Sequence, residues 1–328
     1  MQRFDALDSF RAPPGGVVLT IGNFDGVHVG HRAIIETARE IAARRGDAPV
    51  VVMTFDPHPL AILAPHHAPA RLTGLGERLA ILERLGVHSA IALRSDPALL
   101  SSSAEEFLAR VVEHCRPCAF VEGPDFNFGR NRGGSLETLR QHADRYGYSV
   151  HAVDAVRAEV AGESTTVSSS AIRAALRSCD VTAAATMLGR VHRITGLVGH
   201  GAGRGAPLGA PTANLERIVQ LVPGDGVYAA IAQLEDGAFV PAAVNVGLQP
   251  TFEQSEPRVE AHLIDVTVEL RSRALGLHFV RLLRSQVKFS NVAALRQQIA
   301  LDVAQSRQIA GDALPAVRES AARVTASA

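Results

Sequence analysis

Residues 22–31 read Gly-Asn-Phe-Asp-Gly-Val-His-Val-Gly-His, and this stretch decides the fold of the first half of the chain. It follows the apolar run Val17–Ile21, which is typical of a buried parallel strand. It precedes residues 31–45, whose apolar side chains recur at helical spacing. The stretch is therefore predicted to form a strand-to-helix turn, which is where open parallel sheets bind their ligands.

The residue types in this turn favour an anion. Its glycines let the backbone approach a ligand, and the free N–H groups and dipole at a helix amino terminus attract negative charge. His28 and His31 are three residues apart. If the helix has begun by His28, they share one face with Cβ atoms about 5–6 Å apart. The turn therefore predicts a phosphate site.

Length and composition exclude several classes of protein. The 328 residues suggest two domains, and a hydrophobic content of 47% is enough for two cores. The 33 basic and 33 acidic residues cancel, which argues against a nucleic-acid partner bound through bulk charge. No apolar run reaches the roughly 18 residues of a membrane span, and the first residues lack the features of a signal peptide. We therefore expect a cytoplasmic protein with no membrane partner.

Cysteine use points to a structural role. Three cysteines are too few for a disulfide scaffold. Cys115 and Cys118 have redox or half-zinc spacing, but no second Cys-x-x-Cys completes a zinc site and Cys179 is distant. The pair leads into an apolar run, so the sequence favours packing over redox or metal chemistry.

The two halves of the chain differ in periodicity. The first, to about residue 185, alternates apolar strands with amphipathic helices, which indicates a doubly wound α/β fold. The second has short β-prone runs between Gly, Pro and Asn, which indicates a small antiparallel barrel or sandwich, followed by a capping helix over 292–302. Predicted strands are 17–21, 50–54, 90–93, 119–122, 149–153, 196–199, 226–233, 242–247, 258–270 and 277–283, and predicted helices are 31–45, 75–85, 104–112, 135–146, 170–177 and 181–188.

Four motifs in the first half carry a family resemblance. The pattern His-x-Gly-His at 28–31 resembles the signature of the nucleotidyltransferase superfamily. Phe-Asp-Pro-His-Pro at 55–59, Gly-Pro-Asp-Phe-Asn-Phe-Gly at 123–129 and Val-Ser-Ser-Ser-Ala-Ile-Arg at 167–173 are similar to motifs of the FMN adenylyltransferase half of bacterial bifunctional riboflavin kinase/FAD synthetases.

The resemblance implies roles for residues in these motifs. His28 and His31 would stabilise the transferring phosphorus, and Arg173 would hold the outer phosphates. Two alternatives stay open: His58 serves a rigid turn or contacts the ligand, and Phe126 and Phe128 pack on a flavin or in the core. The implied nucleotide-binding residues are Gly22, Asn23, Phe24, Asp25, Gly26, Gly30, Ser169 and Ser170, and the implied flavin-lining residues are Asp125, Phe126, Asn127 and Phe128.

The second half resembles the riboflavin kinase half of the same family. Its motifs are the Gly-rich stretch 201–214 ending in Pro-Thr-Ala-Asn, Asn-Val-Gly-Leu-Gln-Pro-Thr-Phe at 245–252, Val-Glu-Ala-His-Leu at 259–263, and Leu-Arg at 283–284. The resemblance implies that Glu260 is the catalytic base, that Thr212 and Asn214 hold Mg²⁺, and that Arg284 contacts flavin or phosphate. The implied ATP-binding residues are Gly203, Arg204, Gly209, Pro211, Thr212 and Asn214.

The second half also departs from the family pattern. Ala210 stands where Phe is usual, and Gln286 stands where Glu is usual. Arg271-Ser272 replaces a common Tyr-Gly, and Val191-His192 replaces Pro-Tyr. None of these removes an implied phosphate, metal or base residue, but the loss of an aromatic and a Gly turn near a flavin could loosen flavin binding.

The resemblance covers about residues 15–303. It implies a Rossmann-like nucleotidyltransferase domain at 1–185, a small antiparallel β-barrel kinase domain with a C-terminal helix at 186–310, and a tail at 311–328 whose composition is compatible with mobility. The implied function is ATP-dependent phosphorylation of riboflavin to FMN and adenylyl transfer to FMN to give FAD. The implied cofactor is Mg²⁺, and the sequence leaves open whether the protein forms a homo-oligomer. Two rivals are adenylyl transfer alone, beside a kinase-inactive flavin-binding or regulatory domain, and a nucleotidyltransferase with another acceptor.

Overall fold

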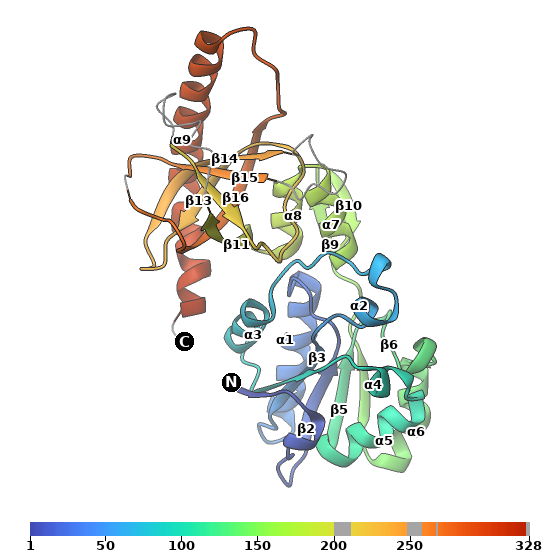
Figure 1. Cartoon of the computed structure of the whole chain (residues 1–328). Coiled ribbons are helices and arrows are strands. Elements are labelled where there is room, and N and C mark those ends of the chain that lie inside the picture. The colour runs from blue at the N-terminus through green and yellow to red at the C-terminus, as the bar shows by residue number, and fades with distance from the viewer. Residues whose placement is uncertain (200–210, 248–257, 267, 326–328) are drawn as a thin grey trace. The chain divides into compact units, whose positions relative to one another are not determined.

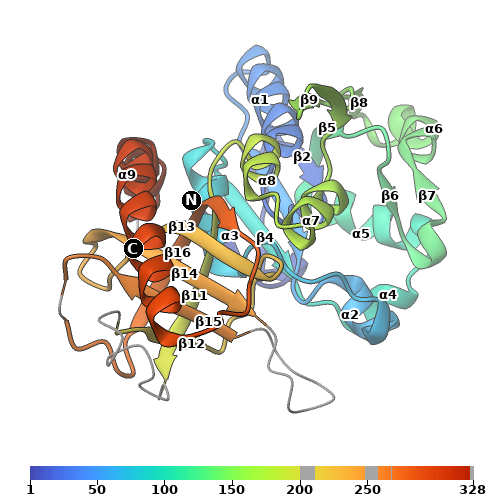
Figure 2. The same ribbon diagram turned by 90° about the horizontal axis from the view of Figure 1, so that it is seen from above.

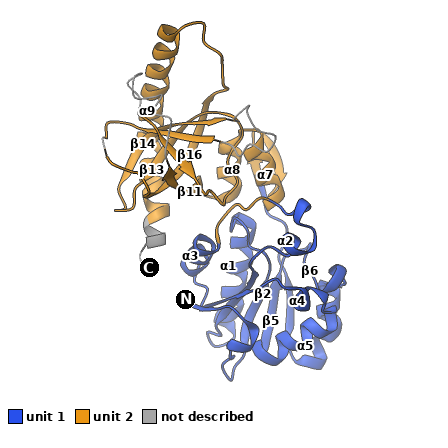
Figure 3. Ribbon diagram, viewed as in Figure 1, with its two compact units in different colours: residues 1–69, 75–157 blue, residues 70–74, 158–328 orange. Residues whose placement is uncertain are grey.

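The computed structural model of the chain describes residues 1–199, 211–247, 258–266 and 268–325. Backbone contacts divide the chain into two compact units (Figure 3). Unit 1 consists of Met1–Pro69 and Leu75–Arg157, and unit 2 consists of Ala70–Gly74 and Ala158–Ala328. Contacts therefore group residues 158–185, which the sequence assigned to the first domain, with the barrel, and they also place in unit 2 a short segment from early in the chain.

Unit 1 is built on a parallel sheet, part of which is labelled in Figure 1. The sheet has six strands in the order β1-β4-β3-β2-β5-β8. All five residues of β2 are buried, because helices cover both faces of the sheet. The predicted doubly wound α/β fold is confirmed. The strands are β1 Gln2–Phe4, β2 Val17–Ile21, β3 Val50–Phe55, β4 Ser89–Leu93, β5 Pro117–Glu122 and β8 Ser149–Ala152.

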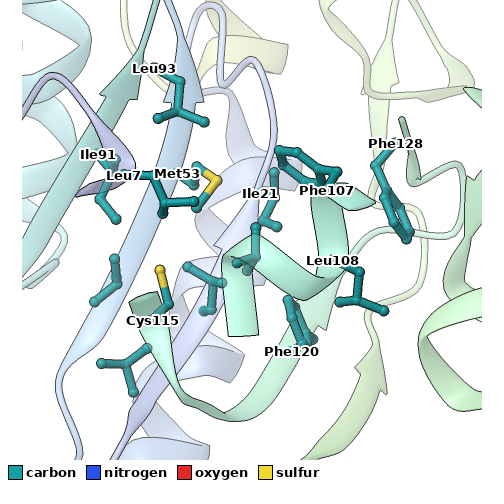
Figure 4. Close-up of a cluster of buried hydrophobic side chains, with 14 of the residues drawn as sticks. Leu7, Ile21, Met53, Ile91, Leu93, Phe107, Leu108, Cys115, Phe120 and Phe128 are labelled. Atoms are coloured by element: carbon teal, nitrogen blue, oxygen red, sulfur yellow. The ribbon is translucent and has the colours of Figure 1, made fainter. Parts of the chain in front are cut away.

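Alternate side chains of β2 enter different cores. Val18 packs with Ile41 of α1 on one face of the sheet. Leu19 and Ile21 pack in one cluster with Phe107 of α5 on the other face. Figure 4 shows Ile21 and Phe107 in this cluster. Helices α1 and α3 cover the first face, and α5 and α6 cover the second. The helices are α1 Val29–Arg44, α2 Pro59–Leu63, α3 Leu75–Arg84, α4 Pro97–Ser101, α5 Ala104–Cys115 and α6 Leu136–Tyr146, with a small ladder of β6 Asn127–Phe128 and β7 Gly134–Ser135.

The strand order reverses beside β2. The chain runs outward from β2 through β3 to β4, and then returns to place β5 on the other side of β2. Ligands of open α/β sheets bind outside the carboxyl ends of the strands at such a reversal. The loops that follow β2 and β5, at 22–28 and 123–126, begin at this edge.

Unit 2 contains a closed barrel of antiparallel strands in the order β11-β12-β15-β14-β13-β16. The sequence allowed a barrel or a sandwich, and the structure is a barrel. Inside it, the rings of Tyr228 and Phe279 pack edge to face, with their centroids 5.3 Å apart. The strands are β11 His192–Gly199, β12 Ala213–Glu216, β13 Gly226–Gln233, β14 Phe239–Gly247, β15 Arg258–Leu263 and β16 Ala274–Arg284, and β9 Arg157–Val160 and β10 Glu163–Thr166 form a separate ladder.

Several predicted boundaries in unit 2 are wrong. Strands β11, β14 and β16 begin three or four residues before their predicted starts, and the two largest errors are at the end of a strand and the end of a helix. The strand predicted over 258–270 ends at Leu263, because the chain turns at Asp265, whose φ is 61°. The helix predicted over 292–302 continues to Thr325 as α9, a 34-residue helix. It continues because Ala310 and Val317 pack against Ile231 of the barrel, and α9 lies alongside β13 (Figure 2). Residues 311–325 are therefore helical where the composition suggested a mobile tail.

Helices α7 Ser169–Arg177 and α8 Val181–Leu188 precede the barrel and pack on each other. Both bounds lie within one residue of those predicted. The Ala70–Gly74 segment also belongs to unit 2, where the Leu221 N–H, between β12 and β13, donates a hydrogen bond to the Arg71 carbonyl at 2.6 Å.

His278 of β16 predicts a pH-dependent stability. Burial lowers its pKa from 6.5 to about 3, with a further contribution from Arg193 and other nearby cations. Below pH 6.5 the His278 side chain is protonated in the unfolded chain but stays neutral in the folded chain. The free energy of unfolding therefore decreases as the pH is lowered. One such group contributes up to about 1.4 kcal/mol per pH unit, or about 2 kcal/mol between pH 6.5 and pH 5. Denaturant unfolding at pH 7 and pH 5 measures this loss.

The variant that checks this expectation is His278→Gln, with the exposed His66→Gln as control. The first should reduce the difference in stability between pH 7 and pH 5, and the second should leave it as in the parent. An unchanged pH dependence in His278→Gln would assign the effect to other groups.

Candidate active sites

The loop after β2 is held in an uncommon backbone conformation. Phe24, Gly26 and Val27 have φ values of 48°, 86° and 39°. Residues other than glycine rarely adopt this left-handed backbone region. The Thr54 hydroxyl donates a hydrogen bond to the Asn23 carbonyl at 3.0 Å, which fixes the loop to the end of β3. Such a coil at the carboxyl edge of a parallel sheet is typical of a ligand-binding turn.

The two predicted histidines lie together at the start of α1. His28 is the N-cap residue, and its Nδ1 accepts a hydrogen bond from the His31 N–H at 3.3 Å. The two imidazoles stack with centroids 3.7 Å apart and an interplanar angle of 16°. Because Nδ1 of His28 accepts this bond, the neutral ring carries its proton on Nε2. The pair is thus placed at a helix amino terminus, where an anion is favoured.

Glu122 is a buried carboxyl that sequence reasoning did not assign to the site. It ends β5 and accepts hydrogen bonds from the Ile21 N–H at 2.8 Å and the Thr20 hydroxyl at 3.4 Å. Burial raises the pKa of Glu122 well above its ordinary value. It ties the end of β5 to the end of β2, from which the histidine loop starts. The available signal was a carboxylate at the end of an apolar strand.

Arg78 of α3 is another buried group that the sequence did not single out. Its Nη1 donates hydrogen bonds to the Thr54 hydroxyl at 3.2 Å and to the Phe55 carbonyl at 3.1 Å. His58, the residue directly after the cis Asp56–Pro57 bond, caps α2 through its Nδ1, which accepts the Leu60 N–H at 3.1 Å. This cap is a structural role for His58, and a contact with a ligand stays a prediction.

The loop predicted to line a flavin combines packed and exposed residues. Phe126 and Phe128 stack at 5.4 Å, and Phe128 belongs to the core beside Phe107 (Figure 4). Asp125 and Asn127 are exposed, and the Asn127 amide donates a hydrogen bond to the Asp125 carbonyl at 2.7 Å. Packing of Phe128 thus anchors the loop, while its polar residues face outward.

Arg173 lies on α7, in unit 2. The N-cap of this helix is Ser168, whose Oγ accepts the Ala171 N–H at 3.1 Å, so Ser169 and Ser170 lie in the first turn. Arg173 is 6% exposed, and its Nε donates a hydrogen bond to the Ala70 carbonyl at 2.7 Å. The residues predicted for adenylyl transfer are therefore divided between the two units, with the histidines in unit 1 and Arg173 in unit 2.

A pocket of about 440 Å³ lies at the barrel and the first turns of α9. It brings together Thr212, Glu260 and Arg284, which the sequence predicted for the kinase reaction. Predicted residues Gly203, Arg204 and Gly209, and the departure Ala210, lie outside the described residues. The pocket is lined by Thr212, Val227, Ala243, Asn245, Arg258, Glu260, His262, Arg284, Gln286, Val287, Phe289, Leu295, Ile299, Asp302 and Val303.

Strand register places amides on both sides of Glu260. It is paired directly with Asn214 of β12 and with Asn245 of β14, so the three side chains share one face of the sheet. The Gln286 amide donates hydrogen bonds to Asn245 Oδ1 at 3.1 Å and to the Val246 carbonyl at 2.8 Å. A Glu side chain at 286 has no N–H to donate in these bonds, so this departure fits its surroundings.

Arg284 lines the pocket and binds α9. Its Nε and Nη2 donate to both carboxylate oxygens of Asp302, at 2.7–3.2 Å. Gln298 donates to the same carboxylate at 2.9 Å, and the guanidinium lies over the Phe289 ring at 5.6 Å. The ion pair fixes the helix that supplies one wall of the pocket.

Asp302→Ala is expected to lower both stability and riboflavin affinity. The variant leaves the half-buried Arg284 guanidinium without its carboxylate partner, which should cost about 1.5–3 kcal/mol in unfolding free energy. Denaturant unfolding and a riboflavin fluorescence titration measure the two effects. Arg307→Ala, which breaks an exposed pair with Asp265, is the control expected to change neither. Parental riboflavin affinity in Asp302→Ala would contradict a role for this pair in shaping the pocket.

The structure does not explain the departure at Ser272, while His192 and the cysteines have local partners. Ser272 has a φ of 62°, which suits the glycine common in the family better than serine. The His192 Nε2 lies 2.8 Å from the Leu221 carbonyl, in hydrogen-bonding distance. Burial raises the pKa of Cys115 to about 12, so its thiol stays protonated, and Cys118 forms no disulfide. These observations agree with a packing role for the cysteine pair.

Family models match both halves of the chain. The model described as FAD synthetase matches residues 11–171, and the model described as riboflavin kinase matches residues 188–310. These segments correspond to the region from before β2 into α7 and to the region from the end of α8 through the barrel into α9.

Curated relatives match nearly the whole chain. The bifunctional riboflavin kinase/FMN adenylyltransferase of Escherichia coli strain K12 is 35% identical over 93% of this chain and 96% of its own length. The proteins of the same name from Pseudomonas fluorescens and Bacillus subtilis strain 168 are 36% and 32% identical, over 94% and 87% of this chain and 98% and 90% of theirs.

A solved structure shares the fold. The crystal structure of a macrolide-efflux protein from Streptococcus pneumoniae covers 93% of this chain and 98% of its own, with 29% identity and a TM-score of 0.83. No helix in the described part of this chain is long and apolar enough to cross a membrane. The motifs, the sheet and barrel, and the full-length matches place this chain in the bifunctional riboflavin kinase/FMN adenylyltransferase family.

Proposed function

We propose that this protein makes FAD from riboflavin in two ATP-dependent steps. The barrel domain phosphorylates riboflavin to FMN, and the parallel-sheet domain adenylylates FMN. The observation that carries this proposal is the match of both halves, in order, to bifunctional enzymes with this name. We assign residues 1–185 to adenylyl transfer and residues 186–310 to the kinase. Because both reactions consume ATP, we place the enzyme in the cytoplasm.

In adenylyl transfer, an FMN phosphate oxygen attacks the α-phosphorus of ATP. A new P–O bond forms, the bond to the β-phosphate breaks, and pyrophosphate leaves. His28 and His31 donate hydrogen bonds to the phosphoryl oxygens on which charge increases, supported by the amino terminus of α1. Arg173 holds the outer phosphates, with Ser169 and Ser170 in the first turn of α7.

The other residues of this site act by binding. Gly22 and Gly26 allow the loop to approach the nucleotide, because neither carries a side chain. Exposed Asp125 and Asn127 offer polar contacts to FMN. The remaining proposed contacts are Asn23, Phe24, Asp25 and Gly30 with the nucleotide, and Phe126, which stacks on the buried Phe128, with the flavin.

In the kinase reaction, Glu260 accepts the proton of the riboflavin 5′-hydroxyl. The hydroxyl oxygen bonds to the γ-phosphorus, the bond to the β-phosphate oxygen breaks, and ADP leaves. Glu260 is 25% exposed at the side chain and lines the pocket, so it can reach a bound substrate. Arg284 contributes a charged wall of the same pocket.

The residues Thr212 and Asn214 fit Mg²⁺ by the chemistry of their oxygens. Mg²⁺ favours hard oxygen ligands and commonly shares its coordination with nucleotide phosphates and water. Asn214 Oδ1 accepts one hydrogen bond and keeps a second lone pair. In the described part of the chain, no group of three or more His, Cys, Asp or Glu side chains could hold a metal ion. When bound, the ion would neutralise charge on the phosphates of ATP.

Product chromatography tests both activities. Purified protein is incubated with ATP and Mg²⁺, in one sample with riboflavin and in another with FMN. We expect FAD in both. FAD from FMN alone would contradict kinase activity and favour an adenylyltransferase with a regulatory second domain. FMN that stays unreacted in the second sample would contradict adenylyl transfer to FMN.

A further inference from the structure

A guanidinium shares the kinase pocket with Glu260. Arg258 is the first residue of β15 and lies two residues before Glu260, so strand alternation places both side chains on one face. Both line the pocket. Arg258 precedes the motif at 259–263 and lies outside the motifs from which the kinase residues were assigned.

Arg258 contacts two groups on which the kinase reaction depends. Its Nη2 lies 2.8 Å from Glu260 Oε1, and its Nε donates a hydrogen bond to Asn214 Oδ1 at 3.0 Å. Asn214 is paired with Glu260 across the strands, so one side chain bridges β12 and β15. Within the described ranges, no second side chain forms an ion pair or hydrogen bond with the Glu260 carboxylate.

These contacts select one oxygen of the carboxylate. Arg258 occupies Oε1 of Glu260, so Oε2 is the oxygen left to accept a proton from the substrate. The bridge also restricts the rotamers of Glu260 and orients the Asn214 amide. Phosphoryl transfer depends mainly on positioning and charge stabilisation, and a small displacement of one group can lower its rate substantially.

We propose that Arg258 is a positioning residue of riboflavin phosphorylation, which acts by holding Glu260 and Asn214 in their reactive arrangement. The inference rests on the proposed kinase function. Arg258 affects turnover through Glu260 and Asn214 and does not itself contact riboflavin.

Steady-state kinetics of the full-length protein test the proposal. Arg258→Ala should lower kcat for FMN formation about ten- to a hundredfold, with KM for riboflavin within about threefold of the parent. Arg258→Lys keeps the charge but cannot bridge both partners, so its kcat should lie between those of the parent and of Arg258→Ala. Arg273→Ala, at an exposed arginine of the same barrel, is the matched control and should behave as the parent. FAD formation from FMN should be unchanged in all three.

A double-mutant cycle separates positioning from other roles. In the Glu260→Gln background, Arg258→Ala should lower kcat by less than about threefold, because its main partner no longer acts as a base. Added guanidinium should partly restore Arg258→Ala, which an unfolded barrel would not allow. Parental kcat in Arg258→Ala, or an equal loss in both backgrounds, would overturn the proposal. Failure of the parent to make FMN would overturn the kinase function instead.

Discussion

His31→Ala is expected to slow FAD formation from FMN and ATP by about two to three orders of magnitude. The variant removes an imidazole that stacks on His28 at the amino terminus of α1. It keeps the backbone N–H that His28 Nδ1 accepts, so the helix cap survives. The loss should therefore reflect transition-state stabilisation and leave the fold intact. Initial rates of FAD production, measured by chromatography, give the effect.

The same samples contain the internal control. FMN formation from riboflavin should stay within about twofold of the parent, because the predicted kinase residues lie on other elements. His66→Ala, at an exposed histidine, should leave both rates unchanged. Equal loss of FMN and FAD formation in His31→Ala would sink the assignment of His31 to a separate adenylyltransferase site.

Glu260→Gln should have the opposite selectivity. FMN formation is expected to fall about a hundred- to ten-thousandfold, because glutamine cannot accept the hydroxyl proton. The amide oxygen can still accept a hydrogen bond from Arg258, so the row of side chains across β12, β15 and β14 should persist. FAD formation from supplied FMN should remain at the parental rate. The two reactions are followed in parallel with separate substrates.

Glu216→Gln is the matched control for this prediction. Glu216 is an exposed carboxylate on β12 of the same barrel, so its replacement makes the same chemical change outside the pocket. It should leave FMN formation unchanged. If Glu260→Gln made FMN as fast as Glu216→Gln, another group would have to be the base.

Much of the parallel-sheet unit was predictable because its signals are local. The bounds of β2 are those that its apolar run indicates, and α1 begins within two residues of the predicted start. A run of Val, Leu and Ile between turn residues has few other ways to be buried. The position of the histidines followed too, since a strand-to-helix turn fixes which edge of the sheet they occupy.

Other features depended on partners far away in the sequence. Four-residue β12 has too short a pattern to be recognised, and it is a strand because it pairs with β11 and β15. The length of α9 depends on the barrel surface that covers Ala310 and Val317. Likewise, Phe128 could face a ligand or the core until its packing partners were known.

The sequence by itself determined the two kinds of fold, the order of the motifs and the residue types of each candidate site, because periodicity and short motifs are local. Only the tertiary structure decided which of these residues meet. Register across three strands aligned Asn214, Glu260 and Asn245, and it brought Arg258 onto two of them. The ion pair between Asp302 and Arg284 holds helix α9 at the pocket. Such contacts are set by long-range pairing and burial, whose free energies no short stretch of sequence contains.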